Sequence, residues 1–228
     1  MSYRLHIANK NYSSWSMRAW VLMKALGIPF KEVLTPFDGA GRQTAFDTFS
    51  PTGKVPCLEH GELTIWDSLA IAEYLAESYS HAWPANGPAR AWARSATAEM
   101  HSGFPALRDE CSMNCSLTID LGTPSDALQA DLDRLDQLWT DGLSRFHGPW
   151  LGGSDFTTVD AFYAPVAVRI RGYQLTLGEP AMAYPERLWH HPSISQWVHE
   201  GIEETWVDKP HEEDCVRGRK ILTNRRQS

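Results

Sequence analysis

The hydrophobic pattern of this chain changes period once, near residue 85, and that change limits the folds it can adopt. Before this point, short apolar runs with strand spacing alternate with stretches in which apolar side chains recur every three or four residues. After it, the pattern is helical. A chain that switches in this way is expected to fold as two units, a small α/β domain followed by a helical one.

The first unit, assigned to residues 1–82, predicts the element order β-α-β-α-β-β-α. Its first helix follows a polar turn and is expected to end at Gly27-Ile28-Pro29. A hairpin is expected around His60-Gly61-Glu62. The four strands are expected at residues 4–8, 31–35, 57–59 and 63–66, and the last helix from 67 or 68 to 79.

A linker at residues 83–88 is indicated by the turn-forming run Pro-Ala-Asn-Gly-Pro at 84–88. The second unit, residues 89–228, is expected to be all helical. The Arg-rich tail from Arg217 to Ser228 is expected to be mobile. The helices of this unit are expected at residues 89–114, 125–146, 157–171 and 194–203.

Composition and missing motifs exclude several classes of function. A net charge of −7 gives no long-range attraction to nucleic acid or anionic lipid, so neither partner is expected. No apolar run approaches the roughly 20 residues of a membrane span. The four cysteines are too sparse for a disulfide scaffold, and the N-terminal run is too charged for a signal peptide, so free thiols and a cytoplasmic location are expected. No P-loop or metal-ligand spacing occurs, and no metal is expected.

Hydroxyl side chains crowd the junction of the first strand and first helix, in Asn-Tyr-Ser-Ser-Trp-Ser-Met-Arg at 11–18. A helix N-terminus offers free amides and the positive end of the helix dipole, so a thiolate held there is stabilised. A serine hydroxyl could donate one more hydrogen bond to it. Simple capping by Ser13 or Ser14 explains the same residues.

A second motif is Ser-Pro-Thr-Gly-Lys-Val-Pro at 50–56, which leads into a strand. If the Val55-Pro56 bond is cis, the backbone of Val55 is left open for an extended peptide to pair with it. An ordinary loop with trans prolines is the alternative.

A third motif, Trp-Asp-Ser-Leu-Ala-Ile at 66–71, opens the last helix of the first unit. Ser68 and the helix amides can hold a carboxylate, and Asp67 can pair with an ammonium group. The pair therefore suits the two charged ends of an amino acid, although helix capping explains it too.

The order of these three motifs resembles the glutathione S-transferase superfamily from residue 3 to about residue 206. The resemblance is to cytosolic, bacterial-type, serine-containing members with a zeta- or theta-like N-terminal motif. It implies a thioredoxin-like N-terminal domain with a mixed sheet and an all-α C-terminal domain. The most specific stretches are Gly-Lys-Val-Pro-Cys-Leu at 53–58, Asp-Ser-Leu-Ala-Ile-Ala-Glu-Tyr-Leu at 67–75 and the capping box Thr-Thr-Val-Asp-Ala at 157–161.

The resemblance implies a cytoplasmic homodimer that uses glutathione as co-substrate and transfers it to a small electrophile. Val55, next to Pro56, would pair through its backbone with the cysteinyl part of glutathione. Asp67 and Ser68 would hold the γ-glutamyl end. The candidates for the glycyl carboxylate are Lys54, Gln43 and Arg42.

The resemblance places the thiol-activating hydroxyl at Ser14 first and Ser13 second, with Ser16 also open. A hydrogen bond from it would lower the pKa of the glutathione thiol and increase the thiolate population. The run at 13–18 looks like Ser-Ser-Cys-Ser-x-Arg of the zeta class, which includes maleylacetoacetate isomerases, but Trp15 stands where that class has Cys. The chain thus departs from the isomerases at this position. The alternatives to a transferase are an isomerase of the maleylacetoacetate type and a non-catalytic glutathione-binding module.

The helix after the linker is implied to wall the electrophile pocket and to meet a partner subunit. Its apolar and aromatic side chains are more often core than pocket, and an arginine there is more often in an ion pair. The candidate pocket residues are Trp15, Met100, Phe104, Leu107 and Arg108.

Overall fold

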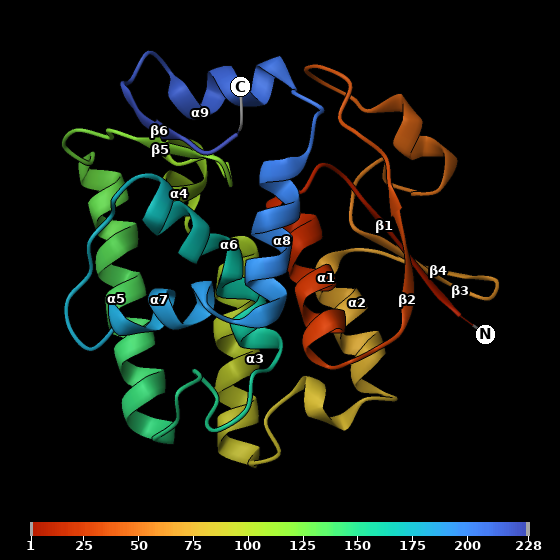
Figure 1. The fold of residues 1–228 in the computed structure, drawn as a ribbon. Coiled ribbons are helices and arrows are strands. Elements are labelled where there is room, and N and C mark those ends of the chain that lie inside the picture. The colour runs from red at the N-terminus through yellow and green to blue at the C-terminus, as the bar shows by residue number, and fades with distance from the viewer. Residues whose placement is uncertain (1, 227–228) are drawn as a thin grey trace.

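The structure is a computed structural model that describes residues 2–226, and in it a sheet-containing N-terminal unit packs beside a helical unit (Figure 1). The N-terminal unit has the predicted element order, except that its second helix is a short 3₁₀ helix. Its elements are β1 (Tyr3–Ile7), α1 (Ser14–Ala25), β2 (Phe30–Leu34), η1 (Thr44–Thr48), β3 (Cys57–His60), β4 (Leu63–Ile65) and α2 (Ser68–Ala76).

The four strands form one mixed sheet in the order β2-β1-β3-β4. Strand β1 runs parallel to β2 and antiparallel to β3, with Leu5 opposite Glu32 on one side and Leu58 on the other. Because β1 and β2 are parallel, the chain must cross over between them, and α1 is that crossover. Gly27, at φ +65°, ends the crossover in a left-handed conformation that glycine adopts without strain. The predicted mixed sheet is confirmed.

Helix α1 lies between the sheet and the second unit, where it packs against helices α6 (Thr158–Gly172) and α8 (Pro192–Glu203) (Figure 1). This position explains why nearly all of its side chains are buried, including the arginine at position 18. The helix therefore joins the two hydrophobic cores. Its N-terminus faces the cavity described below.

The second unit is helical, as expected, and α6 lies at its centre. Thr157 with Asp160 forms the expected capping box at the start of α6. Ser125 caps α5, whose side chains Leu128, Leu132, Leu135 and Trp139 form a buried stripe. The helices besides α6 and α8 are α3 (Gly87–Ser102), α4 (Pro105–Glu110), α5 (Asp126–Phe146), α7 (Ala183–Trp189) and α9 (Lys209–Val216), and a 3₁₀ turn η2 (Ser80–Ala82) precedes them.

The single helix expected at 89–114 is wrong, because the chain breaks at Gly103. Phe104 takes a left-handed conformation at φ +57°, and Pro105 starts the short helix α4. Proline has no amide hydrogen to continue a helix, but it suits the first position of a new one. Helices α7 and α9 were not expected from the sequence.

The expected all-helical second unit and mobile tail also need correction. Strand β5 (Leu117–Ile119) pairs antiparallel with β6 (Ile221–Asn224), so the tail carries a strand of a two-stranded sheet. Arg217 adds ion pairs to Asp109 and Asp214. The strand was missed because its partner lies about a hundred residues earlier. Residues 227 and 228 lie outside the described residues.

No helix within residues 2–226 is both long and apolar enough to cross a bilayer.

Candidate functional site

The main cavity, of about 980 Å³, opens where α1, the loop before η1, the loop before β3 and the start of α2 meet. Residues from all three sequence motifs line it. Its lining consists of Ser13, Trp15, Phe37, Gly41, Arg42, Gln43, Phe46, Pro51, Thr52, Gly53, Lys54, Val55, Pro56, Trp66 and Asp67.

The serines at the start of α1 differ in their access to this cavity. Ser13 lines it and caps α1, accepting a hydrogen bond from the amide of Ser16 at 3.4 Å. The hydroxyl of Ser13 donates to the hydroxyl oxygen of Ser16 at 2.8 Å, and this oxygen also accepts the amide of Ala8 at 3.2 Å. Ser13 and Ser14 are both buried, at 5% and 7% exposure, and Ser13 alone of the two is among the lining residues. The serine at the cavity wall is therefore Ser13.

The loop before β3 presents backbone to the cavity. The Val55-Pro56 peptide bond is cis, and Lys54, Val55 and Pro56 all line the cavity. Among residues 2–226, the amide and carbonyl of Val55 make no backbone hydrogen bond. A polar backbone at the wall of a cavity needs a partner, which an extended ligand could supply.

Asp67 lines the cavity at the N-terminus of α2, and Ser68 lies behind it. Oδ1 of Asp67 accepts the amides of Leu69 and Ala70 at 2.9 and 3.4 Å. Oδ2 lies 3.1 Å from Nε2 of His101, and about half of the Asp67 side chain stays exposed. The Ser68 hydroxyl is fully buried and is not among the lining residues.

The three candidates for a carboxylate anchor differ in their existing partners. Arg42 donates to both carboxylate oxygens of Asp47 at 3.0 Å. The side chain of Gln43 bonds within its own loop, to the backbone of Asp38 and Gly39. Lys54 has no ion pair within the described residues 2–226, so its ammonium is the most available of the three.

The pocket residues expected from the second unit mostly face its interior. Met100, Phe104 and Leu107 are buried in the core, away from the main cavity. Arg108 is half-buried and donates to the carbonyls of Met100, His101 and Gly103. Its guanidinium carbon also lies 4.9 Å from the centre of the Trp15 ring. Of the five, Trp15 alone lines the cavity.

His101 belongs to the site, and sequence reasoning missed it. It reaches Asp67 from α3, and its ring meets that of Trp15 edge-on, with centroids 5.3 Å apart. Burial lowers the pKa of His101, Asp67 raises it, and the nearby charges of Arg18 and Arg108 lower it. The ring is therefore neutral near pH 7 and donates its Nε2 hydrogen to Asp67. Nothing in the spacing along the chain signals this contact between the two units.

The cysteines take no part in the cavity. All four are free and buried, as expected, and no cluster of metal-ligating side chains occurs among the described residues. Burial raises the pKa of Cys57 to about 11 and that of the other three to about 12. They are therefore protonated and unreactive near neutral pH.

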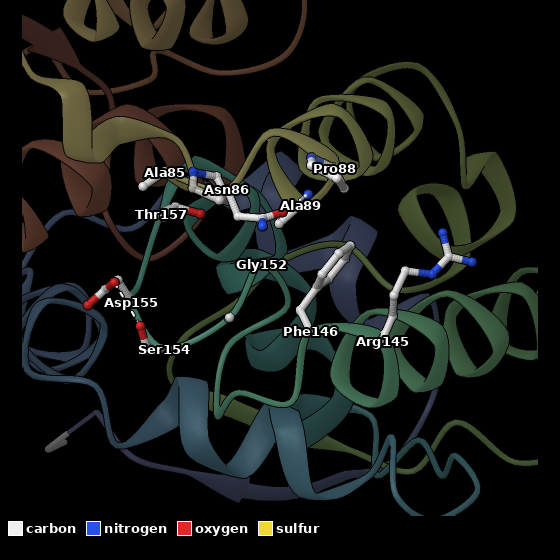
Figure 2. A pocket seen from close by; sticks show the side chains of 12 residues that line it. Ala85, Asn86, Pro88, Ala89, Arg145, Phe146, Gly152, Ser154, Asp155 and Thr157 are labelled. Atoms are coloured by element: carbon white, nitrogen blue, oxygen red, sulfur yellow. Dashed lines mark hydrogen bonds between the residues drawn. The ribbon is translucent and has the colours of Figure 1, made fainter.

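A second cavity, of about 590 Å³, lies where the N-terminal ends of α3 and α6 meet the end of α5 (Figure 2). Asn86 and Thr157, which cap α3 and α6, line it together with Phe146 and Arg145. None of the predicted site residues is among its lining residues, so the chemistry is assigned to the main cavity.

Comparison with known families agrees with this geometry. Residues 12–78 match the family described as glutathione S-transferase, N-terminal domain, and residues 125–198 match glutathione S-transferase, C-terminal domain. The two matches together cover more than half of the chain. The chain belongs to the glutathione S-transferase family.

Individual proteins resemble the chain at sequence identities from 25% to 40%. A glutathione S-transferase of Hyoscyamus muticus is 27% identical over 164 residues, 68% of this chain and 77% of that protein. A dichloromethane dehalogenase of Methylorubrum extorquens is 40% identical over 62 residues, 26% of this chain and only 22% of that protein. A glutathione transferase homologue from Burkholderia, solved with bound glutathione, is 25% identical with a TM-score of 0.66, covering 88% of this chain and 98% of that one.

Proposed function

We propose that this chain is a glutathione S-transferase that binds glutathione in the main cavity and conjugates its thiolate to small electrophiles. The observation that supports this most is that one cavity is lined by Ser13, Val55 and Asp67. They supply a hydroxyl at a helix N-terminus, an unpaired backbone and a carboxylate, which are groups that a tripeptide thiol can use. The bound glutathione of the Burkholderia homologue is consistent with the proposal.

In this proposal glutathione lies extended along the loop before β3. Its cysteinyl part pairs with the backbone of Val55, next to Pro56, and its γ-glutamyl ammonium meets the exposed carboxylate of Asp67. The γ-glutamyl carboxylate lies at the amide of Ser68, the amide at the start of α2 that Asp67 does not cap. The glycyl carboxylate meets Lys54.

The catalytic step uses the hydroxyl of Ser13. In the structure the hydroxyl of Ser13 donates to the oxygen of Ser16, which also accepts the amide of Ala8. Because a hydroxyl hydrogen rotates about its bond to carbon, the hydrogen of Ser13 turns from Ser16 to the sulfur when glutathione binds. Together with the dipole of α1, this hydrogen bond lowers the pKa of the glutathione thiol, which loses its proton to solvent. The thiolate then attacks the electrophile.

The first experiment is a calorimetric titration of the full chain with glutathione and with S-methylglutathione. We expect both to bind, because the cavity contacts proposed above involve the peptide rather than the sulfur alone. Asp67→Asn should weaken both ligands, whereas Asp155→Asn, an exposed residue of the second cavity, should not. Absence of binding at millimolar ligand would reject the transferase assignment.

Turnover then separates the enzyme from its alternatives. Conjugation of a chloronitrobenzene supports a transferase. Isomerisation of maleylacetoacetate without net conjugation favours the isomerase, and binding without either activity favours a non-catalytic module. The homodimer and the cytoplasmic location remain predictions, which size-exclusion chromatography and cell fractionation test.

A further inference from the structure

Arg18 of α1 carries a guanidinium group that is fully buried, and all three of its nitrogens lack a hydrogen-bond partner among residues 2–226. It is packed between two aromatic rings, with its guanidinium carbon 4.2 Å from the centre of Trp15 and 5.1 Å from that of Phe162. A guanidinium does not shed its charge in proteins. A buried, unpaired charge of this kind strongly destabilises a fold unless an anion accompanies it.

Helix α3, whose His101 contacts Trp15, also carries unpartnered polar atoms. On α3, Oγ1 of Thr97 and Nδ1 of His101 lie one helical turn apart, and both are buried without a partner among residues 2–226. The ring of His101 lies 6.4 Å from that of Phe162 and 5.3 Å from that of Trp15. The guanidinium of Arg18 and the ring of His101 thus contact the same two aromatic rings. The hydroxyl of Thr97 can donate to an anion, whereas Nδ1 of a neutral His101 whose Nε2 hydrogen is given to Asp67 can only accept.

The charges in this region do not balance. Arg108 and Arg169 both act on the charge of Arg18, and they lower its pKa after the larger effect of burial. The opposing carboxylate is that of Asp67, which is already bonded to His101 and to the amides of α2. The carboxylate of Asp131 offsets part of the charge of Arg108, whereas the guanidinium of Arg18 has no hydrogen-bonded carboxylate among residues 2–226. A further negative charge would be stabilised here.

Trp15 stands between this positive region and the main cavity. Its indole lines the cavity, and 36% of its surface is exposed. The guanidinium carbons of Arg18 and Arg108 lie 4.2 and 4.9 Å from the centre of the same ring. Rotation of this single side chain would expose Arg18 to the main cavity, because Trp15 both lines that cavity and contacts the guanidinium.

We propose that Arg18 anchors a carboxylate carried by the electrophilic substrate, which enters when Trp15 turns aside. The proposal rests on the proposed transferase function and gives it a substrate class, anionic electrophiles. In the reaction with a chloroarene carboxylate, the glutathione thiol has already lost its proton to solvent. The thiolate forms the carbon–sulfur bond, the carbon–chlorine bond breaks, and chloride leaves with the bonding electrons.

A matched pair of substrates tests this. The pair is 4-chloro-3,5-dinitrobenzoate and its methyl ester, which share the reacting carbon and the leaving group and differ in one charge. We expect wild type to prefer the carboxylate in kcat/KM, corrected for the uncatalysed rates, and Arg18→Met to reduce that preference by roughly tenfold or more. Arg94→Met is the matched control, because Arg94 also stacks on a tryptophan, at 5.3 Å, but lies at the surface.

A second readout does not need turnover. Sodium formate, at constant ionic strength, should raise the melting temperature of wild type and of Arg94→Met more than that of Arg18→Met. If Arg18→Met does not fold, Arg18→Lys and Trp15→Phe carry the test. Arg18→Lys keeps the positive charge but loses the planar guanidinium that can donate two parallel hydrogen bonds to a carboxylate, so it should lower the carboxylate preference. Trp15→Phe has a smaller ring in front of Arg18 and should raise the rate on the carboxylate relative to the ester.

Three outcomes would overturn the proposal. One is an equal preference for carboxylate and ester in wild type. A second is an unchanged preference in both Arg18 variants. The third is a loss of S-methylglutathione affinity in Arg18→Met with the substrate preference intact, which would assign Arg18 to glutathione. Failure of glutathione to bind wild type would reject the transferase function instead, while the formate result would still report on the anion site.

Discussion

Oδ2 of Asp67 and Nε2 of His101 lie 3.1 Å apart, and this contact joins the cap of α2 in the first unit to α3 in the second. The same carboxylate faces the cavity and is the group proposed to receive the γ-glutamyl ammonium. When His101 becomes charged, its imidazolium and the γ-glutamyl ammonium would thus compete for the carboxylate of Asp67. Binding at the N-terminal unit is thereby coupled to a residue of the helical unit.

This coupling predicts a pH dependence of S-methylglutathione affinity, a ligand without a titrating thiol. Because the pKa of His101 is lowered from 6.5, mainly by burial, the ring is neutral at neutral pH and gains a proton below about pH 6.5. The imidazolium then pairs with Asp67 and competes with the ligand ammonium. Calorimetry should show affinity falling by roughly two- to fivefold as the pH decreases to about 5.5.

The matched variant for this experiment is His101→Gln, which should bind with little pH dependence over that range. His199→Gln, at an exposed histidine that pairs with Glu203, should behave like wild type. A similar pH dependence in all three proteins would show that another group is responsible.

Replacing Ser13 by Ala should lower kcat/KM for a chloronitrobenzene by roughly ten- to a hundredfold, the loss expected for a hydrogen bond to a charged group. The reason is that Ser13, rather than Ser14, lines the cavity. The pKa of the bound thiol, followed by thiolate absorbance, should rise in the same variant. Ser95→Ala, at an exposed serine of α3, is the control. If Ser14→Ala shows the loss instead, Ser14 is the thiol-activating residue, as the sequence resemblance implies.

Replacing Lys54 by Met should weaken glutathione binding by roughly fivefold, because it removes a cation that has no acidic partner among residues 2–226. Arg42→Met should cost less, since Arg42 is engaged with Asp47. Glutathione monoethyl ester, which lacks the glycyl carboxylate charge, identifies the contact by calorimetry. Wild type and Lys54→Met should bind this ester equally well. A persisting difference in affinity would exclude Lys54 as the residue that holds the glycyl carboxylate.

Replacing Asp160 by Asn should lower the free energy of unfolding by roughly 2–4 kcal/mol, because several buried donors lose an acceptor. Its Oδ1 accepts from Leu151 and Tyr184, and its Oδ2 accepts from Thr157. An asparagine has only one acceptor oxygen, so its NH₂ group must face either the donors of Leu151 and Tyr184 or that of Thr157. Urea unfolding near pH 7.5, with Asp155→Asn as control, measures the difference. Equal midpoints would mean that the network contributes little to stability.

Local signals in the sequence were sufficient to predict the element order of the first unit and the start of α6 in the second. The stop at Gly27 and the capping box at Thr157 act on neighbouring residues, so their effect can be inferred from the chain itself. The gathering of Val55 and Asp67 in one cavity followed from the order of motifs that resembles a known family.

Long-range contacts and side-chain direction could not be predicted from the sequence. The resemblance ranks Ser14 above Ser13, the structure shows Ser13 lining the cavity, and which of the two activates the thiol stays a prediction. His101 was missed because its partner is in the other unit. Met100 and Phe104 have the same residue types whether they line a pocket or, as here, fill the core.

The tail is the clearest case of a long-range contact, and it yields the last prediction. Amides of residues 221–224 should exchange hydrogen roughly tenfold or more slowly than in an unstructured peptide, because β6 pairs with β5 and Arg226 is bonded to Glu212 at 3.2 Å. A chain that ends at Val216 should lose protection at residues 117–119, where β5 has no other strand in its sheet. Exchange followed by mass spectrometry measures both regions, and helix α5 serves as the internal reference. Fast exchange of 221–224 in the full chain would restore the mobile tail expected from composition, since a strand that does not protect its amides is not formed in solution.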